Sequence, residues 1–404
     1  MKLYCDITLP ASKSESNRAL MIAAYGGFSA DFQNLSDSKD TLILKKALSC
    51  LPFIDSRQRT NPSGNDIKGK PQTIDISDCG TAARFLTTYL SCHDGDWLLT
   101  GTERMRQRPM APLVDALRSL DSDIQYVENE GCLPLRIKGK PISGGEIAVY
   151  MTQSSQFASS LLLAAPMFPQ GLEMELHGEL SSMPYLDMTI AMQRHFLAHV
   201  VRHGRTVVVK PNPYQPRPFS VEPDWSSASY WYEMAAFSEE CEIRLKGLGK
   251  RSLSLSKGRH NLQGDTIIAE WMAQLGVGTF AEGEDVVLRK IPFEKRPLHF
   301  DFSLNPDLYP TMAATCAGLH IDAKFTGLDN LALKESDRVE TLRSELNKLG
   351  NDPVHFCTHN DHRIVMALAP LALLCGTVSF DHPEVVGKSY PNFWIDASFL
   401  PVNR

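Results

Sequence analysis

A short polar segment followed at once by an apolar, helix-forming segment recurs along this chain. Ser12 to Arg18 precedes Ala19 to Ala24, and Asp78 to Thr81 precedes Ala82 to Leu90. Each polar segment supplies Ser, Thr, Asp or Asn where a helix N-cap is favoured. We call the polar segment together with the first helical turn a helix opening. Four further openings begin at Gln153, Glu222, Asn305 and Asn360.

Strand-like runs lie between these predicted helices. They are Thr73 to Ile76, Trp97 to Thr100, Leu135 to Ile137, Glu146 to Tyr150, Thr206 to Val209, Val286 to Leu288 and Val378 to Phe380. Strands that alternate with helices predict an α/β or α+β architecture with repeated β-α units. A length of 404 residues suggests two domains. The polar stretch Arg57 to Gln72 predicts a surface loop, and the prolines of Pro211 to Pro218 suggest a crossing between domains.

Composition excludes several classes of protein. Hydrophobic residues make up 43% and charged residues 22%, as in ordinary globular chains. The net charge of −6 argues against a protein that binds nucleic acid regardless of sequence, because such binding needs a basic excess. Nine scattered cysteines without a CxxC pair fit neither a disulfide scaffold nor a zinc site. The longest apolar stretch, Ile364 to Cys375, is too short to span a bilayer. We therefore expect a cytoplasmic enzyme.

The helix openings have the residues of an anion site. A helix N-terminus attracts anions through its unpaired N–H groups and its partial positive charge. Several openings add cations or hydroxyls: Lys13, Ser14, Arg18, Thr81, Arg84, Ser154, Ser155, Gln156 and Arg363. The segment Glu103 to Pro109 is also dense in arginine. Ordinary caps and solvated charges are the alternative for any one opening, but their repetition in both halves favours a shared anion cleft.

Two segments in the second half of the chain contain charged residues that could take part in catalysis. Lys334 and Arg338 are four residues apart, which predicts that they share a face at the start of a helix running to about Leu349. Asp307, between Pro306 and an apolar helix, could serve as an N-cap or as a general base towards a hydroxyl. Spacing alone leaves both roles of Asp307 open.

Other catalytic templates are missing from the sequence. The chain has no GxxxxGK[ST] phosphate loop, no GxGxxG after a strand and no GxSxG nucleophile elbow. His359 and His362 are three residues apart, but neither an HExxH motif nor a cysteine partner accompanies them. We therefore predict no metal site.

Eight motifs together cover almost the whole chain. In order they are LPASKSESNRAL (9–20), DCGTAARFL (78–86), ERMRQRP (103–109), SSQF (154–157), SSMPYLDMT (181–189), EPDWSSASY (222–230), KESDR (334–338) and NDHR (360–363). This set closely resembles the motifs of the 5-enolpyruvylshikimate-3-phosphate synthases, a family of enolpyruvyl transferases. The resemblance implies transfer of the enolpyruvyl group of phosphoenolpyruvate to the 5-hydroxyl of shikimate 3-phosphate, with release of phosphate, on the pathway to chorismate.

The resemblance also implies a fold. It is two similar lobes, each of three βαβαββ units with helices inside and sheets outside, like an inverted α/β barrel. The lobes would comprise residues 12–222, and residues 1–11 with 223–404. The active site would lie in the cleft between the lobes, which closes on the first substrate. The family implies two small-molecule substrates, no metal or organic cofactor, no nucleic acid or membrane, and a monomer.

Site residues follow from the resemblance, motif by motif. Those implied for shikimate 3-phosphate are Lys13, Ser14, Arg18, Ser154, Ser155, Gln156, Ser182, Asp307, Asn330 and Lys334. Those implied for phosphoenolpyruvate are Lys13, Gly80, Arg108, Gln156, Arg338, Arg363 and Lys388. Lys13 and Lys334 would also serve the reacting centre. Asp307 would be the base for the 5-hydroxyl proton, and either Glu335 or Lys13 would protonate the methylene carbon.

The chain departs from the family pattern at a few positions. Asp78 stands where Asn is common, and we expect it to cap the following helix rather than to bind substrate. Cys79, Phe85 and Met183 also differ from the usual residues, so the sequence leaves glyphosate sensitivity open.

Two alternative functions can be weighed against these motifs. The sister enzyme that acts on UDP-N-acetylglucosamine commonly has a cysteine before its Arg-Pro pair, and Gly101 to Gln107 contain none. A non-catalytic paralogue that binds a phosphorylated metabolite would lack Asp307, Glu335 or Lys334, and all three are present.

Overall fold

The computed structural model describes residues 1–29, 31–51, 70–249, 262–351 and 353–403. The chain divides into two compact units, which we call unit 1 and unit 2. Unit 1 contains residues 1–13, 36–39 and 222–404, and unit 2 contains residues 14–35 and 40–221. The loop predicted at Arg57 to Gln72 falls mostly outside the described residues. No described helix is long and apolar enough to cross a membrane.

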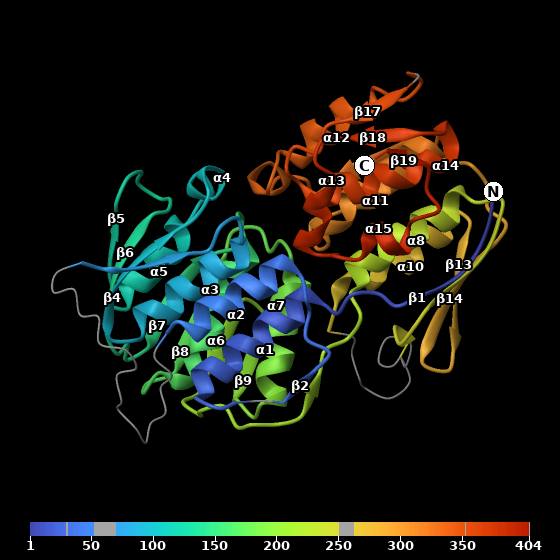
Figure 1. The fold of residues 1–404 in the computed structure, drawn as a ribbon. Helices are drawn as coiled ribbons and strands as arrows, with labels where there is room; N and C mark the ends of the chain where they lie inside the picture. Colours follow the sequence, from blue (N-terminus) through green and yellow to red (C-terminus); the bar gives the residue numbers. More distant parts are fainter. Residues whose placement is uncertain (30, 52–69, 250–261, 352, 404) are drawn as a thin grey trace. The chain divides into compact units, whose positions relative to one another are not determined.

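Unit 2 contains two four-stranded sheets, a small pair of strands and the helices between them (Figure 1). Its strands are β2 (Phe32–Gln33), β3 (Gln72–Asp75), β4 (Gly95–Thr100), β5 (Asp123–Tyr126), β6 (Leu135–Gly139), β7 (Gly145–Tyr150), β8 (Leu172–His177), β9 (Val200–His203), β10 (Thr206–Val209) and β11 (Phe219–Ser220). Its helices are α1 (Lys13–Gly26), α2 (Lys39–Ser49), α3 (Gly80–Ser91), α4 (Glu103–Arg106), α5 (Ala111–Ser119), α6 (Ser155–Ala164) and α7 (Met183–His195), with the first residue of α1 and of α2 assigned to unit 1.

Unit 1 contains sheets of four, three and two strands. Its strands are β1 (Lys2–Ile7), β12 (Glu240–Leu245), β13 (Val277–Glu282), β14 (Asp285–Lys290), β15 (Leu298–Asp301), β16 (Ala323–Thr326), β17 (Val354–Phe356), β18 (Val378–Phe380) and β19 (Val402–Asn403). Its helices include α8 (Trp225–Phe237), α10 (Ile268–Ala273), α11 (Tyr309–Gly318), α12 (Arg338–Leu346), α13 (His362–Leu368), α14 (Ala372–Cys375) and α15 (Phe393–Asp396). Short 3₁₀ turns include η2 (Gly264–Ile267), η3 (Pro306–Leu308), η4 (Leu331–Leu333) and η6 (Pro383–Lys388).

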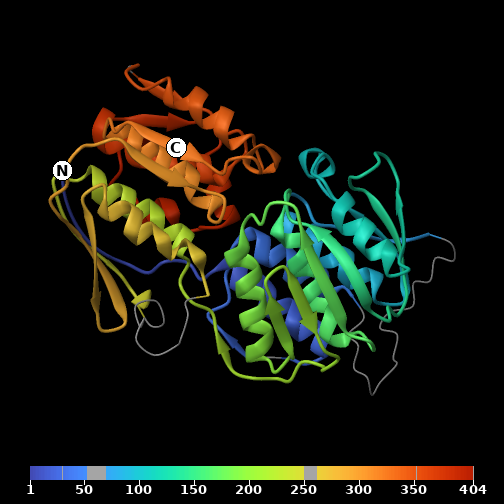
Figure 2. The same cartoon turned by 180° about the vertical axis from the view of Figure 1, so that it is seen from behind.

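The three four-stranded sheets share one topology. Their strand orders are β3-β4-β6-β5, β7-β8-β10-β9 and β1-β12-β14-β13. In each, the first pair is parallel and the other two pairs are antiparallel. A parallel pair needs a crossover, and α3, α6 and α8 lie in the three crossovers. This topology is the βαβαββ unit. Figure 2 shows the strands of the β7-β8-β10-β9 sheet on the outside of unit 2.

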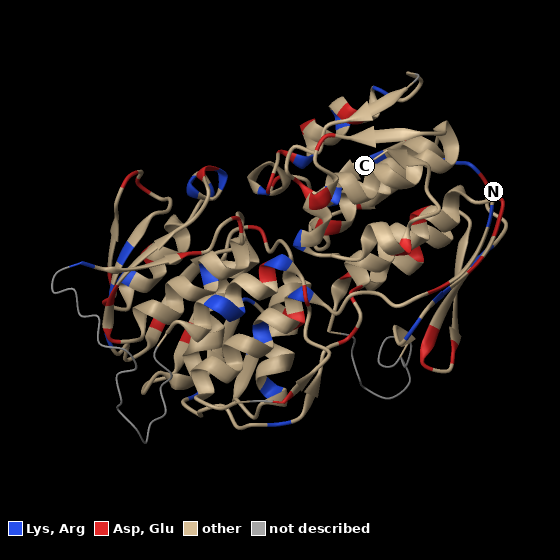
Figure 3. Cartoon of the chain, viewed as in Figure 1, with Lys and Arg blue, Asp and Glu red and all other residues tan. Residues whose placement is uncertain are grey.

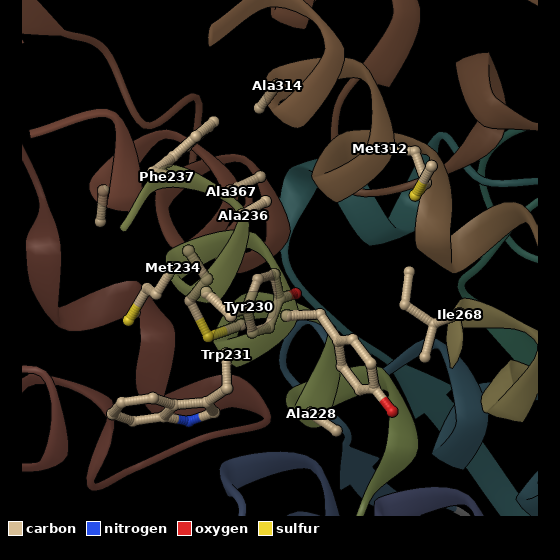
Figure 4. Packing of buried hydrophobic residues seen from close by; sticks show 14 of the residues in the cluster. Ala228, Tyr230, Trp231, Met234, Ala236, Phe237, Ile268, Met312, Ala314 and Ala367 are labelled. Carbon is tan, nitrogen blue, oxygen red and sulfur yellow. The ribbon is translucent and has the colours of Figure 1, made fainter. Parts of the chain in front are cut away.

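The crossover helices form the cores of the two units. Every residue of α3 and of α8 is buried, as are all residues of α6 except Gln156. A helix that is buried all round needs an apolar or small residue at nearly every position. Figure 4 shows how α8 meets this need, with Tyr230, Trp231 and Met234 packed in the core of unit 1. Helices inside and sheets outside confirm the predicted fold class for each unit.

The outer face of the β1 sheet is polar. Arg244 of β12 and Arg289 of β14 each donate to Glu282 of β13, at 2.7 Å. Figure 3 shows acidic and basic residues along the strands of this sheet. Ile243 and Leu245, which alternate with Arg244 on β12, are buried on the inner face. This alternation is expected of a strand in a sheet with one solvated face.

Candidate active site

Five charged residues of unit 1 form one ion-pair cluster. Asp307 lies on η3, Glu335 follows η4, Arg338 begins α12, and Asp361 and Arg363 open α13. We call these five residues the carboxylate–arginine cluster. The five residues come from three segments that are far apart in the sequence. The packing of α11, α12 and α13 brings these segments together.

Arg338 lies at the centre of the cluster, with only 2% of its side chain exposed. Its Nη1 is 3.0 Å from Asp307 Oδ1 and its Nη2 is 3.0 Å from Glu335 Oε2. Its Nε donates to Asp361 Oδ2 at 2.8 Å. All three edges of the guanidinium are therefore paired with carboxylates, which favours a fixed geometry.

Asp307 is held from two sides. Arg363 Nη2 donates to its Oδ2 at 2.7 Å, opposite the bond from Arg338. Burial alone would raise the pKa of the Asp307 carboxyl, but neighbouring cations hold that pKa well below its usual range. In order of influence these cations are Arg363, Lys334, Arg338 and Lys13. Asp307 is therefore charged at neutral pH.

Three other predicted residues lie near the cluster in unit 1. Lys388, on η6, is 4% exposed, and its Nζ is 3.9 Å from Glu335 Oε1. Asn330 is buried, and its Oδ1 accepts no hydrogen bond from any described residue. Lys334 lies close enough to act on the charge of Asp307. Buried cations and an unsatisfied amide oxygen are what a site for a charged, hydroxylated ligand would present.

His362 is a buried neighbour of the cluster. Burial, followed by the nearby charge of Lys13, lowers the pKa of its imidazole well below the usual value. The ring is therefore neutral at neutral pH. His359 instead lies 3.1 Å from Glu345, away from His362. Within the described ranges, no three metal-binding side chains come together.

Arg18 links three helices of unit 2. It lies on α1 and is buried, and its Nε donates to Thr189 Oγ1 on α7 at 2.8 Å. Its Nη2 donates to the carbonyl of Tyr185 on α7 at 3.0 Å and to Ser159 on α6 at 3.4 Å. Arg18 therefore links α1 to α6 and α7, the helices whose openings contain Ser154, Ser155 and Ser182.

The openings of α3 and α6 also meet. Gln156 Nε2 donates to Thr81 Oγ1 at 3.2 Å, and Ser154 caps α6 by accepting from the N–H of Gln156. A Cβ at Gly80 would lie 2.6 Å from Nη1 of Arg108, so the lack of a side chain there leaves room for this arginine. Four of the predicted site residues are thus neighbours at one end of α3 and α6.

The opening of α7 contains a strained residue. Ser182 is buried and adopts a left-handed conformation, with φ of 56° and ψ of 32°, which a non-glycine residue adopts at an energetic penalty. Strain of this kind clusters at functional sites. Tyr185, three residues on, lies beside Arg18, and sequence analysis did not single it out. Its place in the first turn of α7 was the available signal.

The structure corrects two sequence-based expectations. Lys334 and Arg338 do not share a helix face, because α12 begins at Arg338, and Lys334 has an extended backbone. Asp337 sets this start by accepting from the N–H of Glu340. Cys79, not Asp78, caps α3, because the helix begins at Gly80 and Cys79 Sγ accepts from the N–H of Ala82.

The structure also decides against one of the two roles that the sequence left open for Asp307, the helix cap. Its carboxylate does not cap a helix, because both of its oxygens bind arginines and Leu308 is the N-cap of α11. Asp361 is the carboxylate that both caps a helix and binds an arginine. Sequence reasoning recognised only its place in a helix opening.

Arg84 has a structural role. Its guanidinium donates to the carbonyls of Gly80 and Pro109 and is buried. It thereby fastens the Arg108–Pro109 segment to the start of α3. This bonding explains why an arginine occupies a buried position next to a predicted anion site.

Comparisons with known proteins identify the family of this chain. The family profile of EPSP synthase (3-phosphoshikimate 1-carboxyvinyltransferase) matches residues 1–396. A 3-phosphoshikimate 1-carboxyvinyltransferase of Bacteroides fragilis is 42% identical over 98% of this chain and 95% of its own. One from Haemophilus influenzae is 33% identical over 96% and 94%.

Solved structures show the same fold. An EPSP synthase from Acinetobacter baumannii superposes with a TM-score of 0.71 at 21% identity, covering 98% of this chain and 96% of the other. The enolpyruvyl transferase NikO from Streptomyces tendae gives 0.63 at 14% identity, covering 98% and 95%. The family match extends over nearly the whole chain, and the eight motifs lie within it. The chain belongs to the EPSP synthase family.

Proposed function

We propose that this chain transfers the enolpyruvyl group of phosphoenolpyruvate to the 5-hydroxyl of shikimate 3-phosphate. The 5-oxygen adds to the central carbon of phosphoenolpyruvate while the methylene carbon gains a proton. Loss of phosphate from the central carbon, together with loss of one proton from the methyl carbon formed in the first step, then restores the double bond. The observation that carries the proposal is the carboxylate–arginine cluster, where Asp307 lies among four cations in a chain of this family.

Residues of unit 2 supply most of the proposed site for shikimate 3-phosphate. Ser14, Arg18, Ser154, Ser155, Gln156 and Ser182 are the members. Two observations support this assignment: the buried Arg18 that links α1 to α6 and α7, and the strained backbone of Ser182. Hydroxyls and N–H groups at helix N-termini suit a phosphate. From unit 1, Lys13, Asp307, Asn330 and Lys334 complete the set.

Phosphoenolpyruvate carries a phosphate and a carboxylate, so its site needs several cations. Lys13, Gly80, Arg108, Gln156, Arg338, Arg363 and Lys388 are the proposed residues. Arg forks bind both groups bidentately. The burial of Arg363 and Lys388 supports this role, because buried cations act in a low dielectric where their attraction for anions is strong. Arg338 holds the carboxylates of Asp307 and Glu335 beside them.

Asp307 is the proposed base for the 5-hydroxyl proton. Its charged state fits a proton acceptor, and Lys13 and Lys334 beside it stabilise the charge that develops at the reacting centre. Glu335 or Lys13 donates the proton to the methylene carbon. The bond from Arg338 to Glu335 orients that carboxylate.

Phosphate release tests the reaction. The chain should release phosphate from phosphoenolpyruvate when shikimate 3-phosphate is present, and not when UDP-N-acetylglucosamine replaces it. Lys13→Met should abolish turnover, whereas Lys45→Met, at an exposed lysine of α2, should leave it unchanged. Release with UDP-N-acetylglucosamine alone would overturn the substrate assignment. Full activity of Lys13→Met would overturn the role of Lys13.

Two further expectations complete the proposal. The family resemblance predicts a monomer. The resemblance and the composition predict a cytoplasmic location, and no helix among the described residues could span a membrane. Sedimentation equilibrium and cell fractionation would test them.

A further inference from the structure

Asp265 is a buried carboxylate of unit 1 that none of the eight motifs contains. It lies on η2 and is 3% exposed. Its Oδ2 accepts a hydrogen bond from Ser226 Oγ, in the first turn of α8, at 2.5 Å. Its Oδ1 accepts from Asn305 Nδ2, just before η3, at 3.1 Å. One carboxylate therefore links three segments that are far apart in the sequence.

Gln263, two residues earlier, holds the same end of α8. Its Oε1 accepts from the N–H of Trp225 at 2.9 Å, and its Nε2 donates to the carbonyl of Pro223 at 2.9 Å. The position of Asp265 relative to α8 is thus fixed by its own bond to Ser226 and by the two bonds of Gln263. The bond to Asn305 extends this fixed frame to η3.

The segment that Asp265 holds carries Asp307. Asn305 occupies the N-cap position of η3, but its side chain makes no hydrogen bond to that turn. Its amide N–H donates to Asp265 instead. Pro306 follows, and its ring restricts the backbone between the anchored amide and Asp307. The carboxylate of Asp307 is held at its other end by Arg338 and Arg363. Its backbone position therefore depends on the bond between Asp265 and Asn305.

The charges of the two aspartates also interact. Burial raises the pKa of Asp265 to about 6, and the charge of Asp307 contributes in the same direction. Such an interaction is mutual, so the charge of Asp265 also favours the protonated form of Asp307. Four cations act on Asp307 in the opposite sense. A general base must retain affinity for a proton in order to remove one, and the charge of Asp265 helps Asp307 to do so.

We propose that Asp265 is a positioning residue for Asp307, fixing the segment of Asp307 through Asn305 and opposing the cations around its carboxylate. This inference rests on the proposed function, in which Asp307 accepts the hydroxyl proton. The charged groups that act on Asp265 are Asp307 from η3 and Arg363 from α13. α8 contributes the hydroxyl of Ser226.

The test compares Asp265→Asn with Asn305→Ala, and uses Glu270→Gln, at an exposed carboxylate of α10, as the control. Asn keeps the shape of Asp265 and removes its charge. We expect kcat per folded enzyme to fall tenfold or more in Asp265→Asn and Asn305→Ala, with KM for both substrates within threefold of wild type. The double variant should be no slower than the slower single variant, because both act on one segment. Glu270→Gln should match wild type.

The pH profile separates this role from a merely structural one. Asp265 loses its charge as the pH falls through about 6, so the ratio of wild-type kcat to Asp265→Asn kcat should shrink over that range. The ratio cancels any titration of the substrate phosphate. The thermal midpoint of Asp265→Asn at pH 8 should not fall, because this substitution removes a buried charge.

Three outcomes would overturn the inference. They are an unchanged kcat per folded enzyme, a constant kcat ratio across pH 6, and full additivity of the two substitutions. If the wild-type chain releases no phosphate, the proposed function fails instead. In that case the urea unfolding midpoints of the two single variants and of the double variant test the coupling of Asp265 to Asn305. Additive shifts of these midpoints would refute the coupling.

Discussion

Side chains from several segments of unit 1 surround Asp307, and the sequence predicts their residue types better than their partners. The motifs identified Arg338 and Arg363, yet they gave no sign that both would bind Asp307. Pairing depends on how α11, α12 and α13 pack, which is a long-range property. The cations around Asp307 keep it charged, and this makes the proposed base testable by a substitution that preserves its shape.

Asp307→Asn should lower kcat by about 100-fold to 10,000-fold, the usual contribution of a general base. The dissociation constant for shikimate 3-phosphate should change far less, since the amide keeps a polar contact. Steady-state kinetics and a fluorescence titration of shikimate 3-phosphate would measure the two quantities. A change in KM alone, with kcat preserved, would refute the assignment of Asp307 as the base.

Gly80→Ala should weaken phosphoenolpyruvate binding through Arg108. The added methyl would lie 2.6 Å from Nη1 of Arg108 and would push the guanidinium aside. We expect KM for phosphoenolpyruvate to rise about tenfold, as for the loss of one charge-assisted hydrogen bond. The fold should not suffer, because Ala favours a helix more than Gly does.

A double-mutant cycle with Arg108→Ala checks this mechanism. If Gly80→Ala acts by moving the guanidinium, it should have little further effect once that guanidinium is absent. An equal rise in KM in both backgrounds would show that Gly80 acts by another route.

The helix openings are the elements that the sequence predicted best. Helix openings were predicted from Asp78, Gln153, Glu222 and Asn305, and α3, α6, α8 and α11 begin within a few residues of these positions. The apolar run from Ile364 divides into α13 and α14 near Pro370, since proline interrupts a helix. The start of α12 was placed too early, because Lys334 has an extended backbone and Asp337 is the N-cap of the helix.

Asp361→Asn should destabilise unit 1 by about 3–5 kcal/mol, because it leaves a buried guanidinium without one of its counter-charges. Asn caps a helix as well as Asp does, so the loss is electrostatic. Asp337→Asn is the matched control, since Asp337 caps α12 without a described ion pair and lies at the surface.

Urea unfolding followed by tryptophan fluorescence suits this measurement. Four of the five tryptophans belong to unit 1: Trp225, Trp231, Trp271 and Trp394. We expect Asp337→Asn to change the free energy of unfolding by no more than about 0.5 kcal/mol. Equal losses in the two variants would show that capping, and not the pairing with Arg338, accounts for the effect.

At the scale of the whole molecule, the three four-stranded sheets repeat a single plan that no sequence period revealed. Similar topology requires similar burial patterns and not similar residues, so the repeat was visible only in the pairing of strands. The proposed site residues also come from both unit 1 and unit 2. The free energy of unfolding of each unit should depend on pH through the buried titratable groups of that unit.

His362 should make unit 1 less stable in acid. The pKa of its buried imidazole is lowered in the folded state, whereas an unfolded histidine has a pKa near 6.5. The unfolded chain therefore binds more protons below about pH 6.5, and the contribution of His362 to stability is lost as the pH falls. One proton corresponds to at most about 1.4 kcal/mol per pH unit.

Urea unfolding at pH 5 to 7.5 would measure this slope. His362→Gln should reduce it, whereas His355→Gln, at an exposed histidine of β17, should leave it unchanged. Equal slopes in wild type and His362→Gln would show that the imidazole is not kept neutral by its surroundings.

The first strand has a consequence for how this chain is made. β1 pairs in parallel with β12, and Tyr4 and Glu240, which share this sheet, are 236 residues apart. At about 5–20 residues per second, a ribosome takes roughly 10–50 s to reach the partner of β1. Unit 2 can finish folding during that interval, while β1 waits. A fragment of residues 222–404 would lack β1 and expose the edge of β12, so it should aggregate unless a peptide of residues 1–13 is added during refolding.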